Sequence, residues 1–194
     1  MDLPFQPGYY SADECRSLGF ARVGEGAAVA RNCTILGVEN IVLGECVRID
    51  GYTTIVATRG QLRIGSFVHI CSSCVLSARG GIELGDYSSL SHGVKLLSAI
   101  DDFSGDAMTN STLPDDVLRV QAAPIRIGRY VPIGSGTVVA AGVVIGEGAA
   151  VTALSFVGSD LPEWTICSGN PAEPVRQRAR GLLRHLDRLG RAID

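Results

Sequence analysis

Aliphatic residues recur at every sixth position along most of this chain. From Ile127, six consecutive hexads (IGRYVP, IGSGTV, VAAGVV, IGEGAA, VTALSF and VGSDLP) each begin with Ile or Val. The second residue of each hexad is Gly or another small residue, and the fifth is never charged. The same frame occurs upstream in shorter blocks, with slips between them at 35–42, 55–63 and 82–83; the blocks start at Val23, Leu43, Ile64 and Leu84.

This period of six needs a physical cause. An amphipathic helix repeats about every 3.6 residues and a half-buried strand about every two, so neither explains it. A short strand followed by a turn, repeated on each flat face of a three-sided prism, does explain it. The first and fifth residues of a hexad then point inward, the fifth being small because three faces share a thin interior. The second lies near a corner, where glycine relaxes the backbone constraint.

Three hexads would form one coil, and the coils would stack as parallel strands. We therefore predict an all-β fold, a left-handed parallel β-helix over residues 23–173. A β-sandwich would show turn signals roughly every 8–12 residues instead. A right-handed parallel β-helix would have longer and less regular coils.

The repeat breaks between Ser98 and Pro124. This segment contains five aspartates, several Ser and Thr, and almost no hexad pattern. Segments longer than about 12–15 residues without regular structure are usually functional or disordered. We expect an excursion loop over 98–124 that reaches over a neighbouring subunit and closes a site there, although its aspartates could simply solvate it.

The two ends differ from the repeat. Residues 1–22 form an N-terminal segment with a short predicted helix, in which Ser11 is the N-cap and Glu14 lies three residues on. Residues 174–194 predict a C-terminal amphipathic helix that caps the prism, with Gly181 as a weak point. Its apolar positions, at spacings of three and four, are Val175, Ala179, Leu182, Leu183, Leu186 and Leu189.

Composition narrows the classes of function. The 194 residues carry a net charge of −3, which argues against a nucleic-acid partner. The six cysteines are scattered, and the single C-x-x-C, Cys71 to Cys74, has no second pair, so no metal site is predicted. Free thiols favour a cytoplasmic location. No apolar run approaches the roughly 20 residues of a membrane span, and residues 1–10 lack a secretory signal.

From Val23 to Arg178 the sequence resembles the hexapeptide-repeat acetyltransferases, in their sugar and xenobiotic O-acetyltransferase branch. The most specific part is the last run of hexads followed by Gly169-Asn170-Pro171-Ala172, which matches the family's G-x-P-A motif. The resemblance implies a homotrimer with sites between adjacent prisms. It also implies transfer of acetyl from acetyl-CoA to a hydroxyl or amine of a sugar or nucleotide-linked sugar, in the synthesis of surface polysaccharide such as lipopolysaccharide.

The resemblance also assigns residues to the cofactor. By position, the pantetheine groove would be lined by Ser135, Ala153, Gly158 and Ser159. Arg176 and Arg178 would approach the phosphates of CoA, although Arg178 could equally be a solvated residue at the start of the helix.

Acyl transfer to a hydroxyl requires a general base, usually histidine near pH 7. The family commonly places this histidine where the chain enters the excursion, but here that place holds Asp101 and Asp102. His69 is the first candidate base and also a candidate for acceptor binding, Asp102 the second and His92 the third. Asp101 or Asp102 could act as the base, or could instead bind and orient the acceptor, and an amine acceptor needs no strong base.

Two other classes of protein fit the same prism less well. A γ-type carbonic anhydrase needs three histidines converging on zinc. Here His69 and His92 are 23 residues apart and His185 lies outside the coils, so this class is rejected. A non-catalytic β-helix scaffold is opposed by the excursion and by the Gly-Asn-Pro-Ala end.

Overall fold

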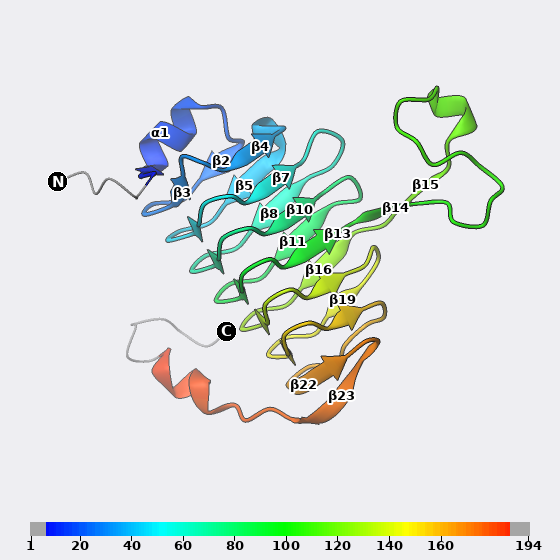
Figure 1. Cartoon of the computed structure of the whole chain (residues 1–194). Helices are drawn as coiled ribbons and strands as arrows, with labels where there is room; N and C mark the ends of the chain where they lie inside the picture. Colours follow the sequence, from blue (N-terminus) through cyan, green and yellow to red (C-terminus); the bar gives the residue numbers. More distant parts are fainter. Residues whose placement is uncertain (1–6, 187–194) are drawn as a thin grey trace.

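The computed structural model describes residues 7–186, and its strands form a three-sided prism of about seven coils (Figure 1). Each of the first six coils contributes one short strand to each of three sheets, and the last coil contributes strands to face A alone. The chain passes from face B to face A to face C before it returns to face B. Within the repeat, neighbouring strands of a face are parallel and in register, as in Ile82 with Ile125. The predicted left-handed parallel β-helix is confirmed.

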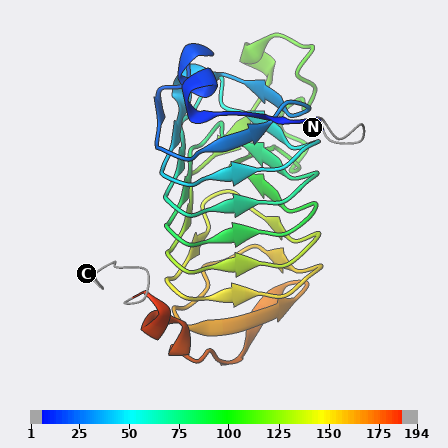
Figure 2. The ribbon, with the colours of Figure 1, turned by 90° about the vertical axis from the view of Figure 1, so that its left-hand side faces the viewer.

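The strands of each face are as follows. Face A holds β1 (Tyr9–Tyr10), β3 (Ala28–Ala30), β6 (Arg48–Ile49), β9 (His69–Ile70), β12 (Ser89–Leu90), β17 (Pro132–Ile133), β20 (Ala150–Val151), β22 (Thr165–Gly169) and β23 (Ala172–Gln177). Face B holds β2 (Arg22–Val23), β5 (Ile41–Leu43), β8 (Leu62–Ile64), β11 (Ile82–Leu84), β16 (Ile125–Ile127) and β19 (Val144–Ile145). Face C holds β4 (Thr34–Leu36), β7 (Thr54–Val56), β10 (Val75–Ser77), β13 (Lys95–Leu97), β18 (Val138–Val139) and β21 (Phe156–Val157). Figure 2 shows the stacked strands of face A.

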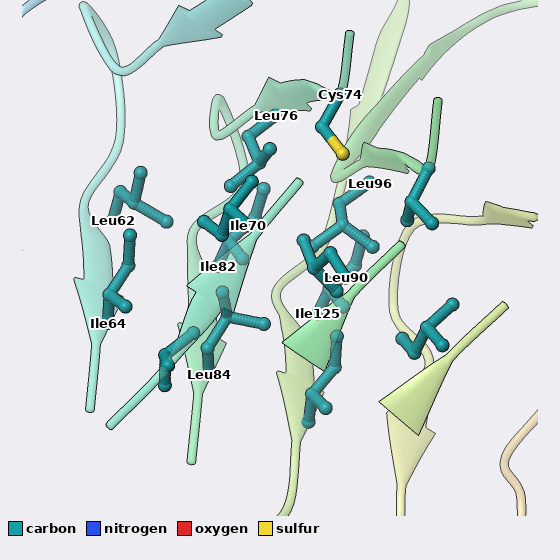
Figure 3. Close-up of a cluster of buried hydrophobic side chains, with 14 of the residues drawn as sticks. Leu62, Ile64, Ile70, Cys74, Leu76, Ile82, Leu84, Leu90, Leu96 and Ile125 are labelled. Atoms are coloured by element: carbon teal, nitrogen blue, oxygen red, sulfur yellow. The ribbon is translucent and has the colours of Figure 1, made fainter. Parts of the chain in front are cut away.

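The residues that begin the hexads fill the interior of the prism. All of them are buried, from Val23 through Ile70 and Leu90 to Val157. Their side chains stack in columns of Leu and Ile, with the small thiol of Cys74 among them (Figure 3). The slips in the frame fall where the chain turns from face C to face B, because those turns are longer than the other two.

The glycines at the second hexad position have a different role from the one expected. None of Gly24, Gly44 and Gly85 has a positive φ. A Cβ atom on any of them would lie 2.4 to 2.6 Å from backbone atoms of the next coil. Glycine is needed there because stacked corners approach so closely. The left-handed backbone occurs two residues later, for example at Phe67 and Tyr130.

An aromatic ladder runs down the corner between faces B and A. The rings of Phe67, Tyr87 and Tyr130 are stacked, with centroids 5.2 and 5.4 Å apart, and Trp164 continues the series 6.3 Å below Tyr130. The coil between Tyr130 and Trp164 has Gly148 at this position, and the indole of Trp164 occupies the space beside it. The ladder connects the coils from that of Phe67 to that of Trp164.

The predicted excursion leaves the prism at the corner between faces C and B. Its base is an antiparallel ribbon of β14 (Ala99–Asp101) and β15 (Val120–Ala122), and its tip contains a short 3-10 turn, η2 (Asp115–Val117). Figures 1 and 2 both show the ribbon leaning toward the N-terminal coils. An ion pair of Asp115 with Arg59, 3.8 Å long, joins the tip to that end of the prism.

The N-terminal helix forms as predicted. Helix α1 (Ala12–Ser17) has a complete capping box, in which the Glu14 amide donates to the Ser11 hydroxyl and the Ser11 amide donates to the Glu14 carboxylate. A short 3-10 turn, η1 (Val38–Asn40), lies on the first turn from face C to face B. Within residues 7–186 no helix is long and apolar enough to cross a membrane.

The predicted helix over 174–194 is wrong for its first part. Strand β23 (Ala172–Gln177) pairs antiparallel with β22, and only a 3-10 helix, η3 (Gly181–His185), follows. The open edge of β22 offers unpaired backbone groups, and pairing with them outweighs a weak helical pattern. Residues 187–194, which include Leu189, lie outside the described residues.

Candidate active site

Polar side chains with catalytic potential gather on the outer surface of face A, close to its corner with face C. The Asp50 carboxylate lies 2.8 Å from His69 Nε2 and accepts hydrogen bonds from Arg48 Nε and Tyr9 Oη, each 2.7 Å long. Cys71 Sγ lies 3.9 Å from His69 Nδ1. Parallel register produces this cluster, because Arg48 on β6 stands directly beside His69 on β9.

The cluster fixes the charge of its carboxylate. Partial burial would raise the pKa of Asp50, but the hydrogen bonds from Tyr9, His69 and Arg48 outweigh burial and lower this pKa to about 2. Burial, together with the charge of Asp50, raises the pKa of the Cys71 thiol. At neutral pH, Asp50 is therefore an anion that can orient the His69 imidazole, while Cys71 stays protonated.

The same side chains offer possible metal ligands. A carboxylate oxygen of Asp50, a ring nitrogen of His69 and the Cys71 thiol lie within 4.8 Å of one another. The Arg48 guanidinium, 2.7 Å from the Asp50 carboxylate, already neutralises that carboxylate and opposes a second cation. The arrangement favours an oriented histidine over a metal centre.

The other two histidines lie elsewhere. His92 occupies the corner between faces A and C, where its Nδ1 lies 2.9 Å from the Ser72 hydroxyl of the coil above. Ser91 precedes it and directly follows β12, in the position that Cys71 takes after β9. His185 lies in η3, beside the aromatic ladder.

Asp101 and Asp102 have opposite environments at the base of the excursion. Asp101 ends β14 and is exposed, whereas Asp102 is only 4% exposed. The Asp102 carboxylate accepts a hydrogen bond from the Ser104 amide and lies 3.5 Å from the Arg119 guanidinium, and these contacts lower its pKa. Asp102 therefore fixes the loop, and Asp101 is the aspartate that is open to a substrate.

The six residues predicted to bind the cofactor do not form one site within the chain. Ser135 and Ala153 stack at the corner between faces A and C, as expected of a groove. Gly158 and Ser159 follow β21, at the far edge of face C, and Arg176 is exposed on β23.

The Arg178 guanidinium is bound to backbone carbonyls of its own chain. Its Nη1 donates to the carbonyls of Tyr130, Gly148 and Ala149 at 2.7, 2.9 and 3.2 Å. Burial lowers the pKa of its guanidinium. Arg178 is half-buried and directly follows β23, so its predicted place as a solvated residue of a helix is wrong, while its role as a phosphate ligand stays a prediction.

Some members of the site were not found from the sequence. Asp50 contacts His69, and Arg48 and Tyr9 contact Asp50, but Asp50 precedes His69 by 19 residues and Tyr9 by far more. The hexad frame itself was the available signal. Asp50 directly follows the inward Ile49, and Cys71 directly follows the inward Ile70, so the two residues occupy the same position in their hexads. Stacking the blocks coil on coil would have aligned them.

No family model matches the chain. The chain is 31% identical, over 90% of its length and 91% of the relative's, to a dTDP-4-amino-4,6-dideoxy-D-glucose acyltransferase of Escherichia coli. It is 30% identical over 118 residues, covering 61% of the chain and 59% of the relative, to WcaF of Escherichia coli strain K12, assigned to colanic acid biosynthesis.

Solved structures agree with these relatives. The N-acyltransferase AntD of Bacillus cereus, in complex with dTDP-4-amino-4,6-dideoxyglucose and coenzyme A, superposes with a TM-score of 0.89 at 31% identity, covering 95% of this chain and 98% of that one. A maltose O-acetyltransferase from Clostridium difficile shares only the fold, with a TM-score of 0.61 at 23% identity over 87% of this chain and 74% of its own. The prism and these relatives together define an acyl-transferring enzyme. The chain belongs to the hexapeptide-repeat acyltransferases, among those that act on sugars and nucleotide-linked sugars.

Proposed function

We propose that this enzyme transfers a short acyl group, acetyl in the first instance, from its coenzyme A thioester to the amine of a nucleotide-linked 4-amino-4,6-dideoxy sugar. The main support is similarity over nearly the whole chain. The sequence resembles an enzyme named for dTDP-4-amino-4,6-dideoxy-D-glucose, and the fold resembles a structure that holds this compound with coenzyme A. The relationship to WcaF supports a place in surface-polysaccharide synthesis.

Ser91 and Asp101 are the side chains we assign to the reacting amine. The AntD structures include variants at one serine and at one aspartate ten positions further along. In the present sequence Ser91 is the only serine that has an aspartate at this spacing, and that aspartate is Asp101. The exposed Asp101 carboxylate would accept the proton that the amine loses as it attacks, while the Ser91 hydroxyl holds the reacting groups by hydrogen bonds.

These two side chains require a second subunit. Ser91 lies at one edge of face C, and Asp101 lies beyond its other edge. The straight run between the corners, 94–98, spans roughly 13 Å at about 3.3 Å per residue, too far for both groups to touch one amine. The excursion of one prism would instead reach the corner between faces A and C of the next, which supports the predicted homotrimer with sites between subunits.

Face C is suited to such an interface. Of the outward positions on its six strands, all within the described residues, only Lys95 is charged. Most of the others are apolar, among them Leu36, which is 51% exposed, and Phe156, which is 38% exposed. Face B, in contrast, presents Arg63, Glu83 and Arg126.

The donor would occupy the C-terminal coils of the same corner. A hollow of about 460 Å³ at this corner is lined by Val138, Leu154, Phe156 and Asn170. Its apolar walls fit a pantetheine arm, and the predicted Ser135 and Ala153 lie on the adjoining turns. Arg176 remains our candidate for a CoA phosphate.

His69 remains a candidate for acceptor binding. It stands one coil above Ser89 and close to Ser91, with its ring oriented by Asp50. We expect the enzyme to act in the cytoplasm, where acyl-CoA is available and where thiols such as its free cysteines stay reduced.

An assay of thiol release tests the proposal. dTDP-4-amino-4,6-dideoxyglucose should accept acetyl, and dTDP-glucose, which offers only hydroxyls, should not. Asp101→Asn should lower kcat by about 10²- to 10⁴-fold because the general base is lost. Asp106→Asn, an exposed aspartate of the same excursion, is the matched control and should retain activity. Transfer to the hydroxyl sugar alone, or full activity of Asp101→Asn, would contradict the assignment.

A further inference from the structure

Arginines converge on a hollow at the corner between faces C and B, on the N-terminal side of the excursion. The hollow measures about 370 Å³, and Arg59, Arg63 and Arg79 line it together with Glu83. It therefore carries an excess of two positive charges in a chain whose net charge is −3. Such a concentration attracts an anion with more than one negative charge.

The guanidinium groups of these arginines have few ion-pair or hydrogen-bond partners among the described residues. Among the described residues Arg79 has no ion-pair or hydrogen-bond partner, and Arg63 donates only to the uncharged Gln61 side chain. Arg59 meets Asp115 of the excursion tip at 3.8 Å, with both side chains more than half exposed, so this pair is weak and can exchange for a ligand. The guanidinium groups are available, and guanidinium is well shaped to bind phosphate oxygens in pairs.

Glycines shape the same corner. A Cβ on Gly60 would lie 2.0 Å from the Ala78 carbonyl, and one on Gly80 would lie 2.3 Å from the Ser98 carbonyl. The turns that carry Arg59 and Arg79 are therefore stacked as closely as the backbone permits.

The hollow lies at a suitable distance from the proposed reaction site. The turn that carries Arg79 stacks directly on the base of the excursion, and that of Arg59 lies one coil further. Neighbouring coils are about 4.8 Å apart, so the turns that carry Arg79 and Arg59 lie roughly 5 and 10 Å from that base. In a nucleotide-linked amino sugar, the pyranose ring and the glycosidic oxygen separate the ring amine from the first phosphate by a comparable distance.

From this juxtaposition we infer that Arg59 and Arg79, assisted by Arg63, bind the diphosphate of the nucleotide-sugar acceptor. The inference rests on the proposed function, which supplies the amine beside Asp101. Coenzyme A also contains a diphosphate, but the apolar hollow suited to its pantetheine arm lies on the other side of the excursion, beside Leu154 and Phe156. The N-terminal hollow is thus assigned to the acceptor, and the excursion tip covers it.

Calorimetric titration of the full-length protein separates these ligands. dTDP and coenzyme A are titrated separately into the wild type and into Arg79→Ala, Arg59→Ala and Arg22→Ala. Arg22 is an exposed arginine of face B outside the hollow and serves as the matched control. Losing one charge-assisted contact should weaken dTDP binding about tenfold or more in Arg79→Ala and Arg59→Ala, without changing the affinity for coenzyme A.

Thymidine provides a second measurement, because it lacks phosphate. Its affinity should be equal in the wild type and in Arg79→Ala, and Arg79→Lys should recover part of the dTDP affinity. Unchanged dTDP binding in Arg79→Ala, or weakened binding of coenzyme A instead, overturns the inference and leaves the proposed function intact. If the wild type binds coenzyme A but neither dTDP nor any other nucleoside diphosphate, the proposed function falls as well.

Discussion

At the scale of single residues, the folded prism brings charged groups into contacts that the unfolded chain does not form. Asp50 is the clearest example, since Tyr9, Arg48 and His69 come from three different strands to bind it. Its side chain is 18% exposed, so water screens these contacts only in part. Such contacts connect stability to pH.

The first prediction concerns this carboxylate. The pKa of Asp50 is about 2 in the folded protein against an ordinary value of 3.8. A depressed pKa stabilises the fold above the ordinary value, and the contribution disappears as pH falls from about 4 to about 2. Asp50→Asn should therefore lower the free energy of unfolding by about 1–2 kcal/mol at pH 7 and by almost nothing near pH 2, measured by urea unfolding. A deficit that is equal at both pH values would contradict this origin.

The second prediction separates two neighbouring arginines. Arg178→Ala removes three hydrogen bonds to carbonyls and should cost about 2–3 kcal/mol of stability, seen as a lower Tm, while the affinity for coenzyme A stays unchanged. Arg176→Ala should show the converse, a native Tm with weaker binding of coenzyme A. Weaker binding in Arg178→Ala at native stability would restore its predicted role as a phosphate ligand.

The sequence predicts inward residues well and polar partners poorly, for a physical reason. Inward positions such as Ile70 and Leu90 follow from the hexad alone, which is a local pattern. The contact between Asp50 and His69 depends on the number of residues in a whole coil, which the slip at 55–63 alters. Asp101 and Asp102 are adjacent in sequence, and only the folded ribbon makes one exposed and the other buried.

At the scale of elements, the aromatic ladder and the C-terminal strand decide how the prism ends. The spacing of the final leucines correctly indicated one apolar face, because Leu182, Leu183 and Leu186 pack together against Tyr130 and Trp164. The prediction of a helix from Pro174 failed because a helical pattern cannot reveal that a free sheet edge lies nearby. The strand β23 then covers that edge.

The third prediction tests the ladder. A Cβ on Gly148 would lie 2.4 Å from the Trp164 ring, and its φ of 65° is also strained for any residue with a side chain. Gly148→Ala should lower the free energy of unfolding by about 2–3 kcal/mol, measured by thermal or urea unfolding. Gly105→Ala, with φ of 91° and open space around it, is the control and should cost about 1 kcal/mol. Equal losses would show that backbone strain, and not the ring, is responsible.

At the scale of the whole molecule, face C is the surface that the proposed assembly needs. Leu97 lies on it in β13, and Val144, 38% exposed, is an apolar residue of face B. Leu97→Glu should convert a trimer into monomers in size-exclusion chromatography with light scattering, because it buries a charge between subunits. It should also abolish transfer, since Ser91 and Asp101 would no longer meet.

Val144→Glu is the matched control and should remain trimeric and active. A wild type that is monomeric and active, or a Leu97→Glu variant that stays trimeric, would contradict the interface on face C. Measuring the Tm of both variants distinguishes lost assembly from lost folding.

The place where the excursion leaves the coil has a consequence for how such enzymes diversify. Ser98 and Ala123, the residues on either side of the ribbon, are joined by a 3.1 Å hydrogen bond and both lie against Gly80, and the coils above and below remain in register. The 24 residues between them form a cassette that can be lengthened, shortened or exchanged without disturbing the stack. In the proposed enzyme, acceptor choice could then evolve by replacing this cassette, while the coils that hold the donor are inherited unchanged.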